Sequence, residues 1–310
     1  MDPKNIKPLI TQADARISEH VRQTPTITLP TGAFGVKAYL TLKLELMQHA
    51  GSFKSRSAFN RILSNSVPPA GVIAASGGNH GAAVAYAARQ LGHPAEIFVP
   101  TLSSPIKVDR LRSYGANVVI TGRDYIEALE KSEIRAAETG SLVVHAFDQA
   151  EVIAGQGTVG LEFENQAPDL DTVLVSVGGG GLIAGIAAWY QGRCKLVSVE
   201  PVRAPTLYQS LTAGKRTEVE VGGIAADALG SRRVGKMMFP IAQQYISKAV
   251  LVEEEAIIQA QKLLWDELRI AAEPAGAVPI AALISGRYQP APEEKVGVLI
   301  CGGNVDLSSL

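Results

Sequence analysis

The 310-residue sequence lacks the features that mark several large classes of protein. Its two cysteines, Cys194 and Cys301, are too few for a disulfide framework and favour a reducing compartment. The formal net charge is −1, and no basic run offers a footprint for nucleic acid or for a membrane surface. No apolar run approaches bilayer length, and the start has no secretory signal pattern. We therefore expect a cytoplasmic protein that binds neither nucleic acid nor membrane.

Hydrophobic residues are plentiful, at 46%, and occur in short β-branched runs that alternate with helical patterns. This alternation is typical of α/β proteins in which helices cover both faces of parallel sheets. The expected strands are Tyr39–Leu44, Gly71–Ala75, Glu96–Val99, Asn117–Ile120, Leu142–Val144, Thr172–Val177, Lys195–Val199, Ala249–Val252 and Val296–Ile300. The expected helices include Gly81–Leu91, Ser104–Tyr114, Tyr125–Glu138, Leu182–Tyr190, Glu253–Leu268 and Ala275–Ile284.

A self-contained βαβαβα run lies between two turn-rich segments in the first half of the chain. We therefore predict two domains, each a mainly parallel sheet flanked by helices. The small domain comprises residues 71–142 and is inserted into a large, discontinuous domain of residues 1–70 and 143–310.

One lysine has an unusual setting. Lys54 stands just inside an expected helix start, behind Gly51, Ser52 and the aromatic Phe53. An amine near a helix N-terminus and an apolar wall loses its proton easily, and a neutral amine can form a Schiff base with an aldehyde cofactor. The alternative is an ordinary surface lysine. The glycine-rich segments downstream favour the reactive role.

Three glycine-rich segments follow expected strands: 76–81 (Ser-Gly-Gly-Asn-His-Gly), 178–181 (four glycines) and 301–304 (Cys-Gly-Gly-Asn). Exposed N–H groups at a helix start suit an anionic group, and glycine lets the backbone approach a ligand closely. Open α/β sheets bind ligands at this edge. The alternatives are glycines that serve only a tight turn and a Cys301 that belongs to the core.

The second segment also allows a different class of function. Gly179, Gly181 and Ala184 loosely fit a dinucleotide fingerprint, and Glu200 ends the next strand about where a ribose-binding acid would lie. An NAD-dependent oxidoreductase is therefore an alternative. It explains neither Lys54 nor the first glycine segment.

Taken in order, the segments resemble the β-family of pyridoxal-phosphate enzymes, called fold type II and similar to the tryptophan synthase β-subunit. Within it, they are most similar to the serine/threonine dehydratase and serine racemase branch. The resemblance covers nearly the whole chain, through residues 22–25 (Arg-Gln-Thr-Pro), 52–54 (Ser-Phe-Lys), 78–80 (Gly-Asn-His), 153–158 (Ile-Ala-Gly-Gln-Gly-Thr), 178–182, 224–227 (Ile-Ala-Ala-Asp), 273–276 (Glu-Pro-Ala-Gly) and 301–306.

The resemblance implies roles around pyridoxal 5′-phosphate. Lys54 would hold the cofactor and then remove the substrate α-proton, while Phe53 packs beside the ring and Asn79 binds the ring hydroxyl oxygen. Cys301 would face the pyridine nitrogen, and Glu273 would lie near the ring. The phosphate would be cradled by Gly178, Gly179, Gly180, Gly181 and the N–H of Leu182. The substrate carboxylate would be surrounded by Ser52, Ser76, Asn79 and His80, with Arg123 as a loosely aligned addition.

Two positions favour elimination over racemisation. Racemases of this branch carry a serine where this chain has Gly77, and glycine has no side chain to donate a proton on the second face of the substrate. A neutral Cys301 thiol would not keep the pyridine nitrogen protonated, which favours prompt loss of a β-leaving group. We therefore expect water to be eliminated and a 2-oxo acid and ammonia to form.

The resemblance also implies a cation site. In racemase-like members a glutamate, a backbone carbonyl and an aspartate bind a divalent ion, and the matching positions here are Glu200, Ala204 and Thr206. One carboxylate with neutral oxygens suits a monovalent ion better, so we expect potassium or sodium. The alternative is that Glu200 merely ends a strand.

The expected activity is that of an L-threonine or L-serine dehydratase (ammonia-lyase), acting on a small hydroxy amino acid as a homodimer. The alternatives are a threo-3-hydroxyaspartate dehydratase, a serine racemase, a β-replacement enzyme of the cysteine synthase type, and a protein that only binds pyridoxal phosphate.

Overall fold

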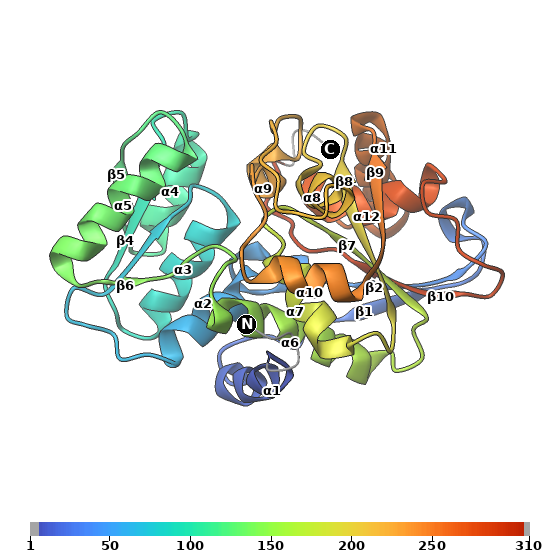
Figure 1. Ribbon diagram of the computed structural model, residues 1–310, viewed down its shortest axis with the longest axis horizontal. Coiled ribbons are helices and arrows are strands. Elements are labelled where there is room, and N and C mark those ends of the chain that lie inside the picture. The colour runs from blue at the N-terminus through green and yellow to red at the C-terminus, as the bar shows by residue number, and fades with distance from the viewer. Residues whose placement is uncertain (1–5, 307–310) are drawn as a thin grey trace.

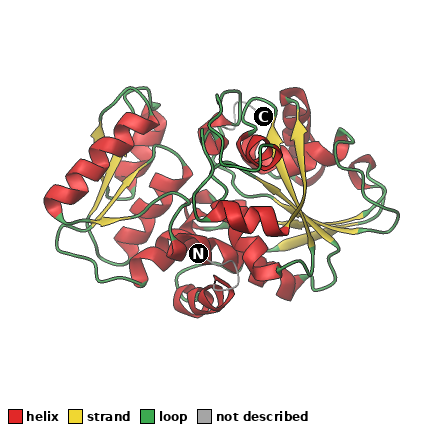
Figure 2. Ribbon diagram, viewed as in Figure 1, coloured by secondary structure: helices red, strands yellow, loops and turns green. Residues whose placement is uncertain are grey.

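The computed structural model describes residues 6–306 and contains two β-sheets, each covered by helices (Figures 1 and 2). The larger sheet has the order β1-β2-β10-β7-β8-β9, and the smaller has the order β5-β4-β3-β6. Every neighbouring pair is parallel except β1 and β2. The predicted α/β class with parallel sheets flanked by helices is confirmed.

The elements match most of the expected ranges to within a few residues. The strands are β1 (Thr26–Leu29), β2 (Tyr39–Lys43), β3 (Val72–Ala75), β4 (Ala95–Val99), β5 (Asn117–Ile120), β6 (Leu142–Val143), β7 (Thr172–Ser176), β8 (Lys195–Pro201), β9 (Ile246–Val252) and β10 (Lys295–Leu299). The α-helices are α1 (Ile6–Ile17), α2 (Lys54–Leu63), α3 (Asn79–Gln90), α4 (Pro105–Ser113), α5 (Tyr125–Thr139), α6 (Ala150–Gln166), α7 (Gly181–Tyr190), α8 (Thr206–Thr212), α9 (Ala226–Leu229), α10 (Met238–Tyr245), α11 (Glu254–Leu268) and α12 (Pro274–Ile284). Short 3-10 turns are η2 (Ala33–Gly35), η3 (Glu45–Met47) and η4 (His49–Gly51).

The small sheet is buried on both faces because its strands alternate between two apolar layers. In β3, Val72 and Ala74 pack toward α2, α3 and α4, whereas Ile73 and Ala75 pack with Ala136 of α5. Successive side chains of a strand point to opposite faces, so a strand between two layers of helices is apolar at every position. This explains why β3 reads as an unbroken apolar run.

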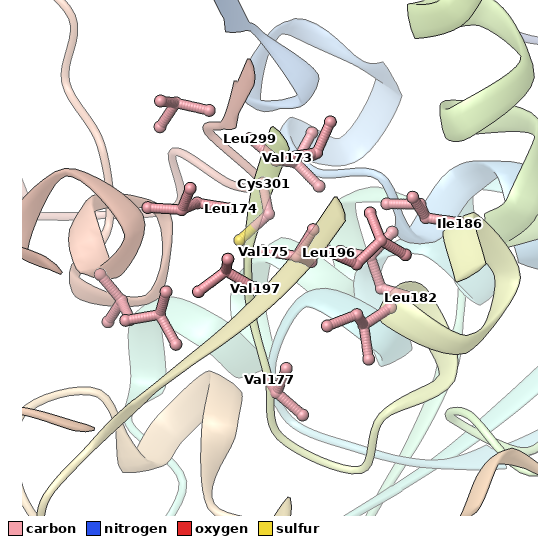
Figure 3. Close-up of a cluster of buried hydrophobic side chains, with 14 of the residues drawn as sticks. Val173, Leu174, Val175, Val177, Leu182, Ile186, Leu196, Val197, Leu299 and Cys301 are labelled. Atoms are coloured by element: carbon pink, nitrogen blue, oxygen red, sulfur yellow. The ribbon is translucent and has the colours of Figure 1, made fainter. Parts of the chain in front are cut away.

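The large sheet carries the main core. Its neighbouring strands β7 and β8 contribute buried valine and leucine side chains, which Figure 3 shows together with Cys301 and the α7 residues Leu182 and Ile186. Helix α12 packs on β7, β8 and β9, with α11 packed against α12, while α7 contacts α6 and α10. In the described part of the chain, none of the helices is long and apolar enough to cross a membrane.

The two sheets draw on different parts of the chain. The small sheet uses strands between residues 72 and 143, and the large sheet uses strands before and after that stretch. Strand β6 pairs with β3 and therefore belongs to the small sheet, so this sheet extends one residue past the predicted boundary at 142/143. The division into 1–70 with 143–310 and 71–142 stays a prediction, and residues 1–5 and 307–310 lie outside the described range.

Several elements were absent from the expected ranges, namely strand β1 and helices α1, α6, α8, α9 and α10. Strand β1 is four residues long, lies between Pro25 and Pro30, and forms the antiparallel edge of the large sheet. Helix α6 contains Gly155, Gly157 and Gly160, which lower its helix propensity, yet it is almost wholly buried between other helices. Packing overrides propensity there.

Candidate active site

A cavity of about 730 Å³ is lined by residues that follow β3, β7 and β10 and by the start of α2. In Figure 1 the small sheet with α4 and α5 lies on the left and the large sheet on the right, and residues from both parts line the cavity. A cavity of this size is typical of small-molecule and cofactor sites. Residues predicted from sequence that line it are Phe53, Lys54, Ser76, Asn79, His80, Arg123, Gly178, Gly179, Gly180, Gly181, Leu182 and Cys301.

Lys54 is the first residue of α2, and its amine is enclosed in this cavity. Nζ donates a 2.6 Å hydrogen bond to the Ala146 carbonyl and lies 5.2 Å from the centre of the Phe53 ring. Burial lowers the pKa of Lys54 from 10.5 to about 8. An amine with this pKa is neutral often enough at physiological pH to attack an aldehyde.

The loop between β7 and α7 offers a row of backbone donors. In the described residues, the N–H groups of Gly179, Gly180 and Leu182 have no protein acceptor. Gly180, with φ +89°, caps α7 and turns these groups toward the cavity mouth. A helix start with free N–H groups binds a phosphate without any cationic side chain.

No side chain fits in this loop. A Cβ on Gly178 would lie 2.9 Å from Leu229 Cα, and one on Gly179, Gly180 or Gly181 would overlap Phe147, Met238 or Gln156. The backbone therefore keeps an open surface for a ligand. An enclosed amine and a row of backbone N–H donors that line the same cavity fit an aldehyde cofactor that carries a phosphate.

Asn79 opens α3 and is held by two neighbours. Its Nδ2 donates to Glu273 Oε1 at 2.6 Å, and its Oδ1 accepts from Asn304 Nδ2 at 2.6 Å. Glu273 lies just before α12, and burial raises its pKa from 4.5 to about 7. These three residues come from three different segments, and Asn79 and Glu273 line the cavity.

His80 was predicted to help surround the substrate carboxylate, and in the structure its ring is neutral rather than cationic. Its Nε2 faces the Val144 carbonyl at 2.9 Å and so carries the proton, while buried Nδ1 has no partner among residues 6–306. Burial lowers the pKa of His80 to about 3, so the ring is neutral. A neutral Nδ1 accepts rather than donates. The groups near His80 that can bind a carboxylate are the free N–H groups of Asn79 and His80 at the start of α3.

Cys301 follows β10 and is 3% exposed. Its Sγ lies 3.3 Å from Ser176 Oγ at the end of β7, and burial raises the pKa of the thiol to about 12. The thiol is therefore neutral at physiological pH. It can exchange a weak hydrogen bond with a ring nitrogen but cannot supply a negative charge.

The remaining predicted substrate residues lie at the margin. Ser76 Oγ accepts from Gly78 N at 3.2 Å within the turn. Ser52 is fully buried, does not line the cavity, and its Oγ has no partner. Arg123 lies at the outer wall with an 89% exposed side chain, paired with Glu127. Their roles toward a carboxylate stay predictions.

Glu200, Ala204 and Thr206 lie away from the cavity, around the start of α8. Both carboxylate oxygens of Glu200 accept 2.7 Å hydrogen bonds from the N–H groups of Leu207 and Tyr208. Thr206 Oγ1 donates to the Ser231 carbonyl at 2.7 Å. The glutamate thus caps the start of α8, and no cluster of three or more acidic, histidine or cysteine ligands occurs in residues 6–306. The cation site at Glu200, Ala204 and Thr206 stays a prediction.

Sequence reasoning did not single out two groups. The Ala146 carbonyl holds the Lys54 amine, and a backbone acceptor leaves no signature in a sequence. Lys107 of α4 and Asp227 of α9 form an ion pair, and both line the cavity. The sequence does not indicate this pair, because Lys107 and Asp227 are 120 residues apart and meet only when α4 packs near α9.

This chain is similar to known proteins in sequence and in fold. The model of the family described as "Pyridoxal-phosphate dependent enzyme" matches residues 17–302. An L-threonine ammonia-lyase of Geobacter sulfurreducens is 40% identical, over 97% of this chain and 76% of its own. The solved maize serine racemase superposes with a TM-score of 0.93 at 33% identity, over 98% of this chain and 94% of that one. A solved threonine deaminase of T.th. superposes with a TM-score of 0.91 at 35% identity, over 97% of this chain and 99% of that one. The chain therefore belongs to the pyridoxal-phosphate dependent enzymes, with the fold type II architecture that its sequence motifs resemble.

Proposed function

We propose that this enzyme is an L-threonine/L-serine dehydratase, which eliminates water from the amino acid and releases a 2-oxo acid and ammonia. The observation that carries the proposal is one enclosed amine, Lys54, in a cavity where the facing turn has no side chain at Gly77. The names of two similar proteins, a threonine ammonia-lyase and a threonine deaminase, support the same activity.

The chain's own groups divide the work. When bound, pyridoxal phosphate supplies an aldehyde for the amine and an acceptor for the electrons released at the substrate Cα. Lys54 would hold the cofactor through its amine, and the same amine, when free, would accept the substrate α-proton. The N–H groups of residues 179–182 hold the phosphate, and those at the start of α3 hold the substrate carboxylate.

The chemistry then needs no second base. Loss of the α-proton and of the β-hydroxyl, which departs as water, leaves a Cα–Cβ double bond. Addition of water to the resulting enamine, after its rearrangement to an imine, releases ammonia and the 2-oxo acid. A neutral Cys301 disfavours a long-lived carbanion, so the leaving group departs before a proton can return.

Serine racemase is the second candidate, because the maize enzyme is similar over nearly its whole length. Racemisation requires a proton donor on the face opposite Lys54. A Cβ at Gly77 would lie 2.9 Å from Ser103 Oγ, so a hydroxyl borders this position even though Gly77 itself has none. The balance between the two reactions is therefore the point to measure.

The test is a substrate panel with purified holoenzyme. L-threonine, L-serine, D-serine and both 3-hydroxyaspartate diastereomers are assayed for 2-oxo acid release, and L-serine is assayed for D-serine. We expect release from L-threonine and L-serine to exceed racemisation at least about tenfold. Comparable lyase and racemase rates, or release only from a hydroxyaspartate, would contradict the proposal.

Three further properties belong to the proposal. A potassium or sodium ion beside Glu200 is tested by activity after dialysis, which either ion should restore and magnesium should not. A homodimer rests on the family resemblance alone and is tested by light scattering of the eluted protein. A cytoplasmic location is supported by the two free cysteines, Cys194 and Cys301, and is tested by cell fractionation.

A further inference from the structure

The orientation of the Asn79 amide is set by groups outside the residues assigned above to the reaction. Asn304 Nδ2 donates to two oxygens, the Ala50 carbonyl at 2.8 Å and Asn79 Oδ1 at 2.6 Å. A reversed Asn304 amide would place Oδ1 against the Ala50 carbonyl, which cannot donate. The Ala50 carbonyl therefore fixes Asn304, and Asn304 fixes Asn79.

The backbone around this contact is shaped to receive Asn304. Ala50 and Gly51 both have positive φ, at 56° and 76°, and a Cβ on Gly51 would overlap the Asn304 side chain. Left-handed conformation at a non-glycine residue is uncommon and persists where surrounding contacts impose it. Three residues after Gly51 the same segment delivers Lys54. The Asn304 amide thus ties the lysine segment to the start of α3.

With Oδ1 of Asn79 directed at Asn304, the Nδ2 group has two hydrogens to place. One goes to Glu273 Oε1, and the other has no protein acceptor in the described residues. Asn79 lines the cavity. The spare N–H is thereby available to a ligand oxygen.

We propose that Asn304 and Glu273 are positioning residues that hold the Asn79 amide with an N–H, rather than an oxygen, toward the cofactor. The inference rests on the proposed function only in placing a cofactor oxygen beside Asn79. Asn304 acts through the two N–H donors of its side-chain amide, and Glu273 acts through the acceptor oxygen of its carboxylate. The substitution Asn304→Asp removes the donors and Glu273→Gln weakens the acceptor, so the two roles can be tested separately.

Glu273 also makes the arrangement sensitive to pH. The groups that face it are Asn79 from α3, the Asn304 N–H, Asp227 from α9, Arg110 from α4 and the Cys301 thiol. Burial is the largest influence and raises its pKa to about 7. Below that pH the carboxyl is neutral and a weaker acceptor, so the Asn79 amide is held less firmly. The contribution of Glu273 to cofactor affinity should therefore fall as the pH drops through 7.

The test compares cofactor affinity of apoproteins, measured by the absorbance change on titration with pyridoxal phosphate. Asn304→Asp replaces both donors by acceptors and turns the Asn79 oxygen toward the cavity. We expect its affinity to fall about tenfold or more. Glu273→Gln keeps an uncharged acceptor, so at pH 8 its affinity should be about threefold below that of wild type. At pH 6, where the wild-type carboxyl is also neutral, the two affinities should converge. Glu294→Gln, which changes a buried glutamate at the far end of β10, is the matched control and should equal wild type at both pH values.

A double variant separates positioning from simple destabilisation. In Asn304→Asp the flipped Asn79 oxygen faces the Glu273 carboxylate, whereas Glu273→Gln can donate to it. The double variant should therefore unfold at a higher temperature than Asn304→Asp alone while its cofactor affinity remains low. Equal cofactor affinity in wild type and Asn304→Asp, or a Glu273→Gln affinity that keeps the same ratio to wild type at pH 6 and 8, would overturn the inference. If Asn304→Asp does not fold, the convergence of Glu273→Gln with wild type decides alone. Wild-type protein that binds no pyridoxal phosphate would overturn the proposed function instead.

Discussion

Two enclosed lysines lie in the same molecule and have opposite surroundings. Lys54 has the Ala146 carbonyl and the Phe53 ring, and no carboxylate of the described residues pairs with its amine. Lys43, at the end of β2, is 0% exposed and pairs with Glu162. It also donates to the Thr24 carbonyl at 2.8 Å. The first amine is left reactive, and the second is fully occupied.

The surroundings of Lys43 form a closed network of charge. Glu162 also pairs with Arg56 at 2.9 Å, and Arg56 pairs with Glu45 at 2.7 Å. Thr24 donates to Glu45 through its hydroxyl at 2.6 Å. Two cations and two anions are thus buried together with their hydrogen bonds satisfied, which is the condition under which buried charge is tolerated.

The two sites are physically connected. Arg56 belongs to the first turn of α2, two residues after Lys54, so the ion network anchors the helix that presents the reactive amine. The comparison teaches that burial alone does not make a lysine reactive. Burial lowers the pKa of both lysines, but the carboxylates of Glu45 and Glu162 oppose that shift at Lys43, whereas no carboxylate of the described residues pairs with Lys54.

The largest effect should come from removing each amine in turn. Lys54→Met should lower kcat by about four orders of magnitude or more, because the cofactor attachment and the α-proton acceptor are both lost. Lys43→Met should keep most of its turnover per folded molecule. The measurement is 2-oxo acid release together with borohydride trapping of cofactor and mass spectrometry of the adduct. An adduct on a residue other than Lys54 would contradict the assignment of the amine.

The free energy of unfolding should respond to the two substitutions in the opposite order, with the larger loss at Lys43. Lys43→Met leaves Glu162 with one of its two cationic partners and should lower the free energy of unfolding by about 3 kcal/mol. Lys54→Met removes an amine whose charge is costly to bury. It should raise the free energy of unfolding of the apoprotein by about 1 kcal/mol at pH 7. Urea unfolding of both apoproteins checks the prediction. A loss of similar size in both variants would show that the two amines do not differ as described.

Much of this contrast was accessible from sequence, and part of it was not. Lys54 could be identified because a glycine, a hydroxyl residue and an aromatic ring precede it and three glycine segments follow other strands. The strands β3 to β10 could be placed because short β-branched apolar runs bounded by turn residues indicate buried strands. Lys43 had no such signal. It ends an apolar strand, and its partner Glu162 is 119 residues away in the sequence. Glu162 lies on α6, whose glycines lower the helix propensity, so the sequence did not indicate this helix.

The cavity wall shows the same division. Motif order predicted that Asn79, the glycine loop and Cys301 face a common site, since parallel strands end at one edge of a sheet. Motif order could not predict that His80 donates to Val144 or that Glu200 caps α8. Those outcomes depend on which backbone groups are left unsatisfied after packing, and only the folded chain specifies that.

The pH dependence of cofactor capture should sharpen the comparison. Capture requires a neutral amine, and the Lys54 pKa lies at about 8 because of burial. The rate at which apoprotein binds pyridoxal phosphate should therefore rise about tenfold per pH unit below 8 and level off above it. Stopped-flow absorbance measures this rate. A rise that continues to pH 10 would show an amine with the pKa of an ordinary solvated lysine.

The smallest effect concerns the Phe53 ring, which, like the Ala146 carbonyl, stabilises the Lys54 cation without carrying a charge. The Phe53 ring lies 5.2 Å from Nζ, within the range at which an aromatic face attracts a cation. Phe53→Leu removes that attraction and keeps an apolar wall, so the pKa of Lys54 should fall by about half a pH unit. The pH at which capture levels off should move down by the same amount. Phe59→Leu, which changes a buried aromatic residue of the same helix that does not line the cavity, is the matched control and should leave it unchanged. If Phe53→Leu moved that pH upward, the ring would act on Lys54 mainly by excluding water, and the difference from Lys43 would rest on desolvation alone.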